Sequence, residues 1–400
     1  MNKKPSLIDM PIAKALSILT LPIILTNFLQ IAYNLTDSFW VGKLWTDAIS
    51  ATTIASSIIF LTISIWSGFA TAWSILISQY FWAKDDKNVA HIAAQSLLMI
   101  FLTSLVIWIL WYIFTPEILS LMKLESWVIP WATSFLKISF LWLVVNFLFF
   151  MFQSIMRWIW KANLPIYIVL ATVLFNFVLD PFLIYWYSFF PEMWVSWAAW
   201  ATFITQTFAC IVWFIIMFSW KFGIHITLKD YIPDLQTIKK TFLLWVPSSI
   251  EMTARSLSFT ILTALVASFW SVATAAYWVS WNFVQIWVIL AMSISIATSV
   301  LVGQHLWASN FKKAKEVYSF SIKYSFIILT IVWILLAVLS PHLIHIFAPG
   351  NTEVIKVWAK IVRISCISFW FIWIQMSINW VLRSMGNTKM PMYLVIVGQW

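Results

Sequence analysis

The chain has 400 residues, of which 62% are hydrophobic and only 10% are charged, and its formal net charge is +10. A soluble domain of this size could not bury so much apolar surface, so a soluble globular protein is excluded. The basic charge does not indicate a nucleic-acid partner, because Lys and Arg gather in alternate gaps between apolar stretches. The composition predicts an all-α polytopic membrane protein.

The apolar stretches are long enough to cross a bilayer core, which takes about 20 helical residues. They predict ten spans, with an eleventh starting near Met390, at residues 15–41, 50–77, 91–114, 131–155, 164–187, 194–218, 241–266, 274–302, 318–340 and 358–382. The alternating basic gaps follow the positive-inside rule, which places the N-terminus on the cytoplasmic side. We expect the chain to lie in the plasma (inner) membrane. We expect no cleavable signal before the first span. Cys210 and Cys366 lie in apolar spans, so we expect no structural disulfide.

The chain repeats itself at an offset of about 225 positions. Residues 22–87 align with residues 247–312 without a gap. A duplicated six-span unit predicts two six-helix bundles, residues 1–225 and 226–400, related by a pseudo-two-fold axis along the membrane normal. The second bundle is incomplete, so we expect the last one to two helices of a twelve-span molecule to be missing from this chain.

Tryptophan is frequent, at 30 residues, and glycine is rare, at 7, although membrane helices normally use more Gly than soluble ones. Trp160 aligns with Gly386 of the sister half, and Trp73 lies among small residues opposite Thr298. Closely packed helices need small residues at such positions, and an indole would hold them apart. We hypothesise that many of these tryptophans are UGA codons that the source organism reads as Gly. The alternative is a natural Trp belt at the membrane surfaces.

A family resemblance becomes visible when Gly is read at such Trp positions. Five segments carry it, at Tyr33–Ala48, Ser78–Asp85, Asn176–Pro181, Val246–Glu251 and Arg383–Thr388. In combination they resemble the multidrug and toxic compound extrusion (MATE) family, over essentially the whole chain, whereas no single motif would suffice. The resemblance implies a secondary antiporter that exports cationic, amphipathic compounds in exchange for Na⁺ or H⁺ by alternating access. It implies a small-molecule substrate, a lipid bilayer and no cofactor beyond the coupling ion, and we expect a monomer.

Three acidic residues lie deep within predicted spans: Asp37, Asp180 and Glu251. A carboxylate at membrane depth costs about 2.5–3.5 kcal/mol on insertion scales, so such acids are functional-site candidates. Asp37 and Asp180 reach a similar depth on outward-running helices, and Asn176 lies one turn before Asp180 on the same face. Oxygens of this kind suit Na⁺, or a carboxylate that accepts a proton. We predict a cation-coupling site at Asp37, Asn176 and Asp180, to which the resemblance adds weight; the alternative is a buried polar tether between helices.

Glu251 is expected near the middle of the seventh span, with Arg255 one turn further on. A structural ion pair and a cation or substrate site are both open for this pair. Further candidates for the cation or substrate site are polar residues within or near the spans: Gln30, Asn34, Thr202, Thr205 and Gln285.

Three prolines inside predicted spans, Pro22, Pro181 and Pro247, are expected to kink their helices. Pro181 also disfavours helical geometry at Asp180 and leaves a backbone carbonyl unpaired. Pro22 and Pro247 occupy equivalent places in the two halves, and interrupted helices at matching positions point to a transport site. The alternative is that each proline only bends its helix.

Other function classes find less support in the sequence. It contains no Walker-type loop, no zinc-ligand spacing and no nucleophile–base motif, so we expect neither an ATP-driven pump nor an enzyme. A membrane enzyme would need clustered acids or His near one membrane face. A flippase for lipid-linked precursors, on a related plan, stays an alternative; it would need several Arg or Lys in its cleft, and only Arg255 is clearly mid-span.

Overall fold

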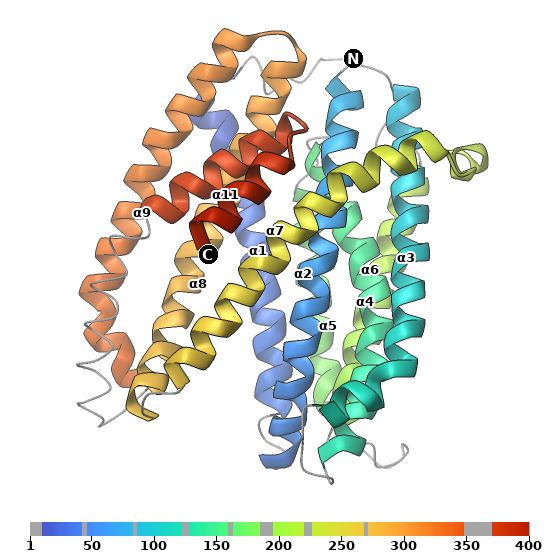
Figure 1. The fold of residues 1–400 in the computed structure, drawn as a ribbon, viewed down its shortest axis with the longest axis vertical. Helices are drawn as coiled ribbons and strands as arrows, with labels where there is room; N and C mark the ends of the chain where they lie inside the picture. The colour runs from blue at the N-terminus through green and yellow to red at the C-terminus, as the bar shows by residue number, and fades with distance from the viewer. Residues whose placement is uncertain are drawn as a thin grey trace. The chain divides into compact units, whose positions relative to one another are not determined.

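The computed structural model describes residues 10–41, 46–82, 86–121, 128–158, 163–184, 195–219, 226–267, 271–347 and 370–399. Within them the backbone is helical almost throughout (Figure 1). The named α-helices are α1 (Ile12–Val41), α2 (Thr46–Trp82), α3 (Asp86–Leu121), α4 (Val128–Trp158), α5 (Asn163–Ile184), α6 (Val195–Phe218), α7 (Leu235–Ala267), α8 (Ser271–Trp307), α9 (Phe311–Phe347) and α11 (Lys389–Gln399). Residues 370–384 form a further helix, and a short 3-10 helix, η2 (Leu228–Tyr231), precedes α7. The predicted all-α fold class is confirmed.

Eight of the described helices are long and apolar enough to cross a membrane. A helix suits this environment because it closes its backbone hydrogen bonds within one segment. α7 is 33 residues long and is not one of the eight, because Glu251, Arg255 and the Ser and Thr residues around them lower its hydropathy. The predicted span at 358–382 lies partly outside the described residues.

The chain forms two compact units, Leu25–Ser249 and a second one of Met1–Ile24 with Ile250–Trp400. Each boundary falls two residues after a proline, Pro22 in α1 and Pro247 in α7. Both prolines lie inside continuous helices. The domain boundary at 225/226, which rests on the sequence repeat, stays a prediction.

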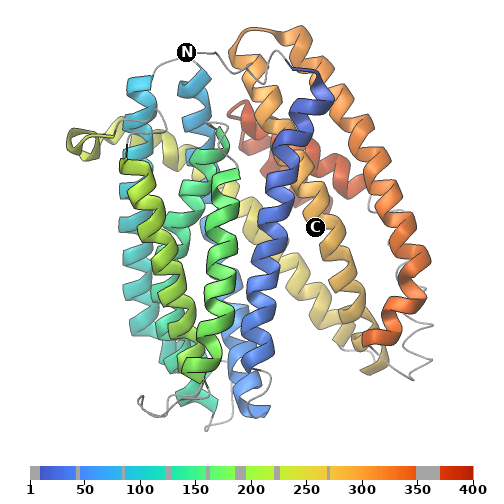
Figure 2. The same ribbon diagram turned by 180° about the vertical axis from the view of Figure 1, so that it is seen from behind.

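In the Leu25–Ser249 unit, α4 is the central helix. It packs against α2, α3 and α6, and α6 packs against α5 (Figures 1 and 2). The contact between α4 and α6 includes stacked aromatic rings, with the centroids of Phe152 and Trp213 5.2 Å apart. Such ring pairs contribute about 0.5–1.5 kcal/mol beyond the area that they bury.

Near its middle, at Ser249, α7 approaches α2 of the same unit closely. The Ser249 hydroxyl donates a hydrogen bond to the Ile65 carbonyl at 2.7 Å. A Cβ atom at Gly68 would lie 2.5 Å from the backbone nitrogen of Ser249, nearer than any side chain allows. Glycine at position 68 is therefore what permits this contact between helix backbones.

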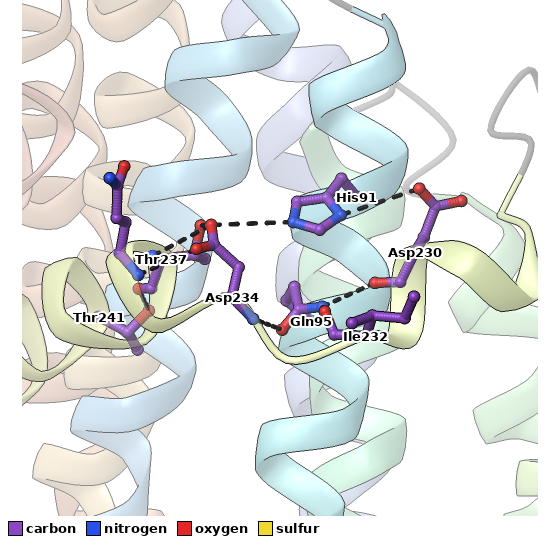
Figure 3. A network of polar contacts seen from close by, with 8 residues as sticks. His91, Gln95, Asp230, Ile232, Asp234, Thr237 and Thr241 are labelled. Atoms are coloured by element: carbon purple, nitrogen blue, oxygen red, sulfur yellow. Dashed lines mark hydrogen bonds and ion pairs between the residues drawn. The ribbon is translucent and has the colours of Figure 1, made fainter.

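The segment between α6 and α7 is fastened to α3 (Figure 3). The buried Gln95 side chain donates through Nε2 to the carbonyls of Asp230 at 2.7 Å and Ile232 at 2.6 Å. Its Oε1 accepts the backbone N–H of Asp234 at 3.3 Å. One turn earlier, the His91 ring lies 3.8 Å from the Asp230 carboxylate and 3.9 Å from that of Asp234. These contacts hold the segment where α7 begins.

Asp234 is the N-cap of α7. Its carboxylate accepts hydrogen bonds from the Thr237 hydroxyl at 2.6 Å, from the Gln236 N–H at 3.0 Å and from the Thr237 N–H at 3.3 Å. The Thr237 hydroxyl first, and the Gln236 N–H after it, lower the pKa of this carboxyl below its ordinary value. A lowered pKa means that the cap stabilises the fold above the unfolded pKa of about 3.9, and that this contribution is lost as the pH falls through the folded value.

We expect Asp234→Ala to destabilise the protein by about 1 kcal/mol at pH 7, because the first turn of α7 loses its acceptor. The difference from wild type should shrink as the pH falls below about 3.9 and through the lowered folded pKa, where the wild-type carboxyl takes up a proton. Thermal unfolding in detergent above and below that pKa measures this, with Asp234→Asn as the control that keeps a capping oxygen. A deficit that stays constant as the pH falls through the folded pKa would argue against the capping role.

In the second unit, α8 and α9 pack together and share a core with the 370–384 helix. Its buried residues are Trp287, Ala291, Leu329 and Trp373.

The 370–384 helix ends in a tight turn at Gly386, whose φ is 83°. The Gly386 N–H donates to the Arg383 carbonyl at 2.8 Å, and the Asn387 N–H donates to the Leu382 carbonyl at 3.0 Å. Helices commonly end this way, with a left-handed residue that is usually Gly because it has no Cβ.

Candidate functional site

Three helices of the Leu25–Ser249 unit bring the predicted coupling residues together. On α5, the Asn176 Nδ2 donates to Asp180 Oδ1 at 2.9 Å. From α6, the Thr202 hydroxyl donates to Asp37 Oδ2 of α1 at 3.1 Å. Asp37 also lies within hydrogen-bonding reach of the Asp180 and Asn176 side chains. We call these four residues, Asp37, Asn176, Asp180 and Thr202, the carboxylate cluster.

The carboxylate cluster contains three oxygens with no hydrogen-bond donor among the described residues: Asp37 Oδ1, Asn176 Oδ1 and Asp180 Oδ2. All three atoms are buried, and Asn176 and Asp180 are 0% exposed. A buried oxygen without a donor costs about 1–3 kcal/mol, and more when it carries charge. A single positive charge placed among these oxygens would satisfy them.

The carboxylate cluster consists of the kind of oxygen ligands that hard cations prefer, and its acids can also take up a proton. It offers two carboxylates with amide and hydroxyl oxygens and no nitrogen or sulfur ligand, unlike the sites that hold zinc or other transition metals. In the part of the chain that the structure describes, no group of three or more His, Cys, Asp or Glu side chains is arranged to hold a metal ion.

Tyr33 adjoins this site, and sequence reasoning missed it. Its hydroxyl lies 2.6 Å from that of Thr205 on α6. Thr205 directs its own proton to the helix carbonyls of Ala201 and Thr202, each at 3.0 Å, so Tyr33 is the donor in this pair. Tyr33 lies one turn before Asp37 on the same face of α1, and that spacing was the signal that could have found it.

Glu251 lies in the other compact unit, and its carboxylate meets two guanidinium groups. Arg255 Nη2 is 3.2 Å from Oε1, and Arg383 Nη2 is 2.7 Å from Oε2. Asn379 Nδ2 donates to Oε1 at 3.4 Å. The ion pair with Arg255 is the one that the spacing suggested. Arg383 comes from the end of the 370–384 helix, and its spacing from Glu251 carries no signal in the sequence.

The remaining predicted residues are less closely tied to these groups. Asn34 is exposed, and Gln30 and Gln285 are half-buried, so their part in a substrate site stays a prediction.

Pro181 does not interrupt its helix, because α5 continues to Ile184. The expectation of non-helical geometry at Asp180 is therefore wrong. Pro181 lacks only the one N–H that would bond the Phe177 carbonyl, and the rest of the turn closes. The kinks at Pro22, Pro181 and Pro247 stay predictions.

Long apolar helices with acids buried inside them define a class, the polytopic α-helical membrane proteins. A family model described as MatE matches the chain twice, over residues 22–182 and 247–399. The chain belongs to the MatE family, which confirms the resemblance drawn from its motifs. The two matches begin 225 residues apart, at the offset of the internal repeat.

The relatives share modest identity with the chain over most of its length. "Probable multidrug resistance protein YoeA" of Bacillus subtilis is 27% identical over 391 residues, which cover 97% of this chain and 84% of the relative. "Multidrug export protein MepA" of Staphylococcus haemolyticus is 22% identical over 380 residues, which cover 94% of this chain and 82% of the relative.

Solved structures share the fold. One, titled as the outward-facing conformation of a multidrug resistance MATE family transporter of the MOP superfamily, matches with a TM-score of 0.89 at 20% identity. That match covers 98% of this chain and 88% of the other. A MOP superfamily transporter from Pyrococcus furiosus matches with a TM-score of 0.88 at 19% identity, over 98% and 88% of the two chains.

Proposed function

We propose that this chain is a secondary active antiporter that exports cationic, amphipathic drugs or toxic compounds in exchange for Na⁺ or H⁺ by alternating access. Membership of the MatE family supports a transporter, and the names of its relatives, which include a multidrug export protein, support drug-like substrates. The single observation that carries the ion coupling is the set of three unpaired buried oxygens at Asp37, Asn176 and Asp180.

The carboxylate cluster suits an exchange mechanism because its donors and acceptors do not balance. With both acids ionised, two negative charges share one amide donor and one hydroxyl donor. A bound Na⁺ or proton would neutralise part of this charge, and its departure would restore the mutual repulsion of the acids. A site whose energy depends on one small cation can bias a conformational equilibrium, as an exchanger requires.

The setting follows from the same family and the same charge pattern. We place the chain in the plasma (inner) membrane with its N-terminus in the cytoplasm, as the alternating Lys and Arg favour, and we expect it to act as a monomer. No cofactor beyond the coupling ion enters the proposal.

Efflux from proteoliposomes tests the proposal directly. We expect the full chain to expel a fluorescent organic cation when an inward Na⁺ or H⁺ gradient is imposed, and to stop when an ionophore collapses that gradient. Gradients of one ion at a time identify the coupling ion. Efflux that persists after both gradients are collapsed would contradict ion coupling. Gradient-independent transfer of a lipid-linked pyrophosphate would favour the flippase instead.

A further inference from the structure

The Glu251 cluster, which consists of Glu251, Arg255, Arg383 and Asn379, carries more positive than negative charge. One carboxylate faces two guanidinium groups, so the net charge of the cluster is +1. The Glu251 side chain is 0% exposed and that of Arg383 is 4% exposed, whereas that of Arg255 is 26% exposed. A buried charge without a counterion is strongly unfavourable, so the second guanidinium calls for a further anion.

Arg383 also has hydrogen-bonding capacity that the described residues do not use. A guanidinium has five N–H donors, and the Nε donor of Arg383 is buried with no acceptor among the described residues. The 2.7 Å contact to Glu251 Oε2 is an ion pair by distance, but it lacks the alignment of a hydrogen bond. The Trp380 ring lies 4.8 Å from the Arg383 guanidinium, which stabilises the cation without neutralising it.

We propose that the Glu251 cluster is an oxyanion site that takes a carboxylate or phosphate group between Arg255 and Arg383. Guanidinium groups bind these two kinds of oxyanion through paired N–H donors, which no monatomic anion matches. The partly exposed Arg255 is the side from which the group enters, and the buried Arg383 Nε is the donor that it satisfies. The oxyanion belongs either to a free solute or to the headgroup of an anionic phospholipid. This inference does not rest on cation coupling at the carboxylate cluster.

The sister half of the repeat argues against a purely architectural role. At the offset of 225 positions, Glu251 aligns with Thr26 and Arg255 aligns with Gln30. The six-span unit therefore does not need either charge at these places in its helix. Arg383 does have a basic counterpart, Arg157, so Arg383 is the less suitable of the two arginines for a test.

Binding of radiolabelled inorganic phosphate to the purified full chain in nanodiscs of phosphatidylcholine tests the proposal. We expect saturable binding. The Arg255→Gln substitution introduces the amino acid that the sister half has at this position, and it should weaken binding at least tenfold. Glu251→Gln should tighten binding about tenfold, because it removes the competing carboxylate and raises the local charge to +2. Lys315→Gln, on the exposed surface of α9, removes one positive charge elsewhere and should leave the affinity unchanged.

The two substitutions are expected to change the phosphate affinity in opposite directions, and this separates the oxyanion site from its alternatives. A structural ion pair predicts that both substitutions lower thermal stability and that neither variant binds phosphate. A cation site predicts that Glu251→Gln abolishes Na⁺ binding while phosphate never binds. Wild type without saturable binding in either lipid, or weaker binding in Glu251→Gln, would overturn the proposal.

A second arm identifies the source of the oxyanion. If phosphate binds to wild type in nanodiscs of phosphatidylcholine and this binding is suppressed in nanodiscs of phosphatidylglycerol, the headgroup is the occupant. If binding persists in both lipids, the occupant is a free solute. Asp37→Asn should bind phosphate normally in either lipid, so failure of ion coupling and failure of this site are distinguishable.

Discussion

Asp37→Asn and Asp180→Asn are each expected to reduce gradient-driven efflux about 10- to 100-fold. Each substitution replaces a charged acceptor by a neutral one of the same shape, and a hydrogen bond or ion contact to a charged group is worth about 1.5–3 kcal/mol. With one carboxylate left, the carboxylate cluster loses the second negative charge that would hold a Na⁺ ion or a proton. Efflux of a fluorescent cation from proteoliposomes, under each gradient in turn, measures the effect.

Thermal stability distinguishes coupling from the alternative of a polar tether between helices. Asn can still hydrogen-bond to Thr202 or Asn176, and the desolvation cost of a buried charge disappears. Both variants should therefore unfold at the wild-type temperature or above it. Glu316→Gln, at an exposed position on α9, is the matched control for loss of one acid and should retain full efflux. Variants that transport normally but unfold at a lower temperature would establish the tether.

The tryptophans at positions 73 and 160 are expected to be glycines in the native protein. We expect the Trp73→Gly and Trp160→Gly variants to be no less stable than the Trp form. Position 160 lies outside the described residues, but its counterpart Gly386 has a φ of 83°. A residue with a side chain costs about 1–2 kcal/mol more there than Gly does.

The buried indole groups also indicate that some of the tryptophans stand at positions where the native protein has Gly. Among the described residues, several tryptophans have a buried indole N–H without an acceptor, and they include Trp66, Trp73, Trp108, Trp142, Trp245 and Trp373. Buried Trp N–H groups usually find a partner, and each one that does not costs about 1–3 kcal/mol. Gly68 shows in addition that a contact between helix backbones in this fold admits no Cβ.

Peptide mass spectrometry of the protein from its source organism decides the point, and an indole mass at both positions would refute recoding. Thermal unfolding gives an independent readout. Phe140, as deeply buried as Trp73, is the control, because Phe140→Ala should lose about 3–5 kcal/mol. A comparable loss in Trp73→Gly would show that the indole belongs to the core.

What the sequence determined by itself is the fold class, the position of most spans, the repeat and the family. These follow from local and periodic signals: a bilayer demands about 20 apolar residues per helix, and it makes every buried acid conspicuous. The same cost marks Asp37 and Asp180 as candidates for a functional site, and helix rise and the one-turn spacing place them with Asn176 at one depth in the membrane.

Only the tertiary structure decided which partners these groups meet. Arg383 reaches Glu251 from a helix more than 120 residues further along the chain, and Gln95 of α3 holds the start of α7 through backbone carbonyls. Such contacts depend on how helices pack, since any side chain on the right face can be brought close. Hydropathy shows which residues are removed from water, whether they face lipid or protein. It does not show which charged side chains pair inside the protein, because that depends on how helices distant in the sequence pack.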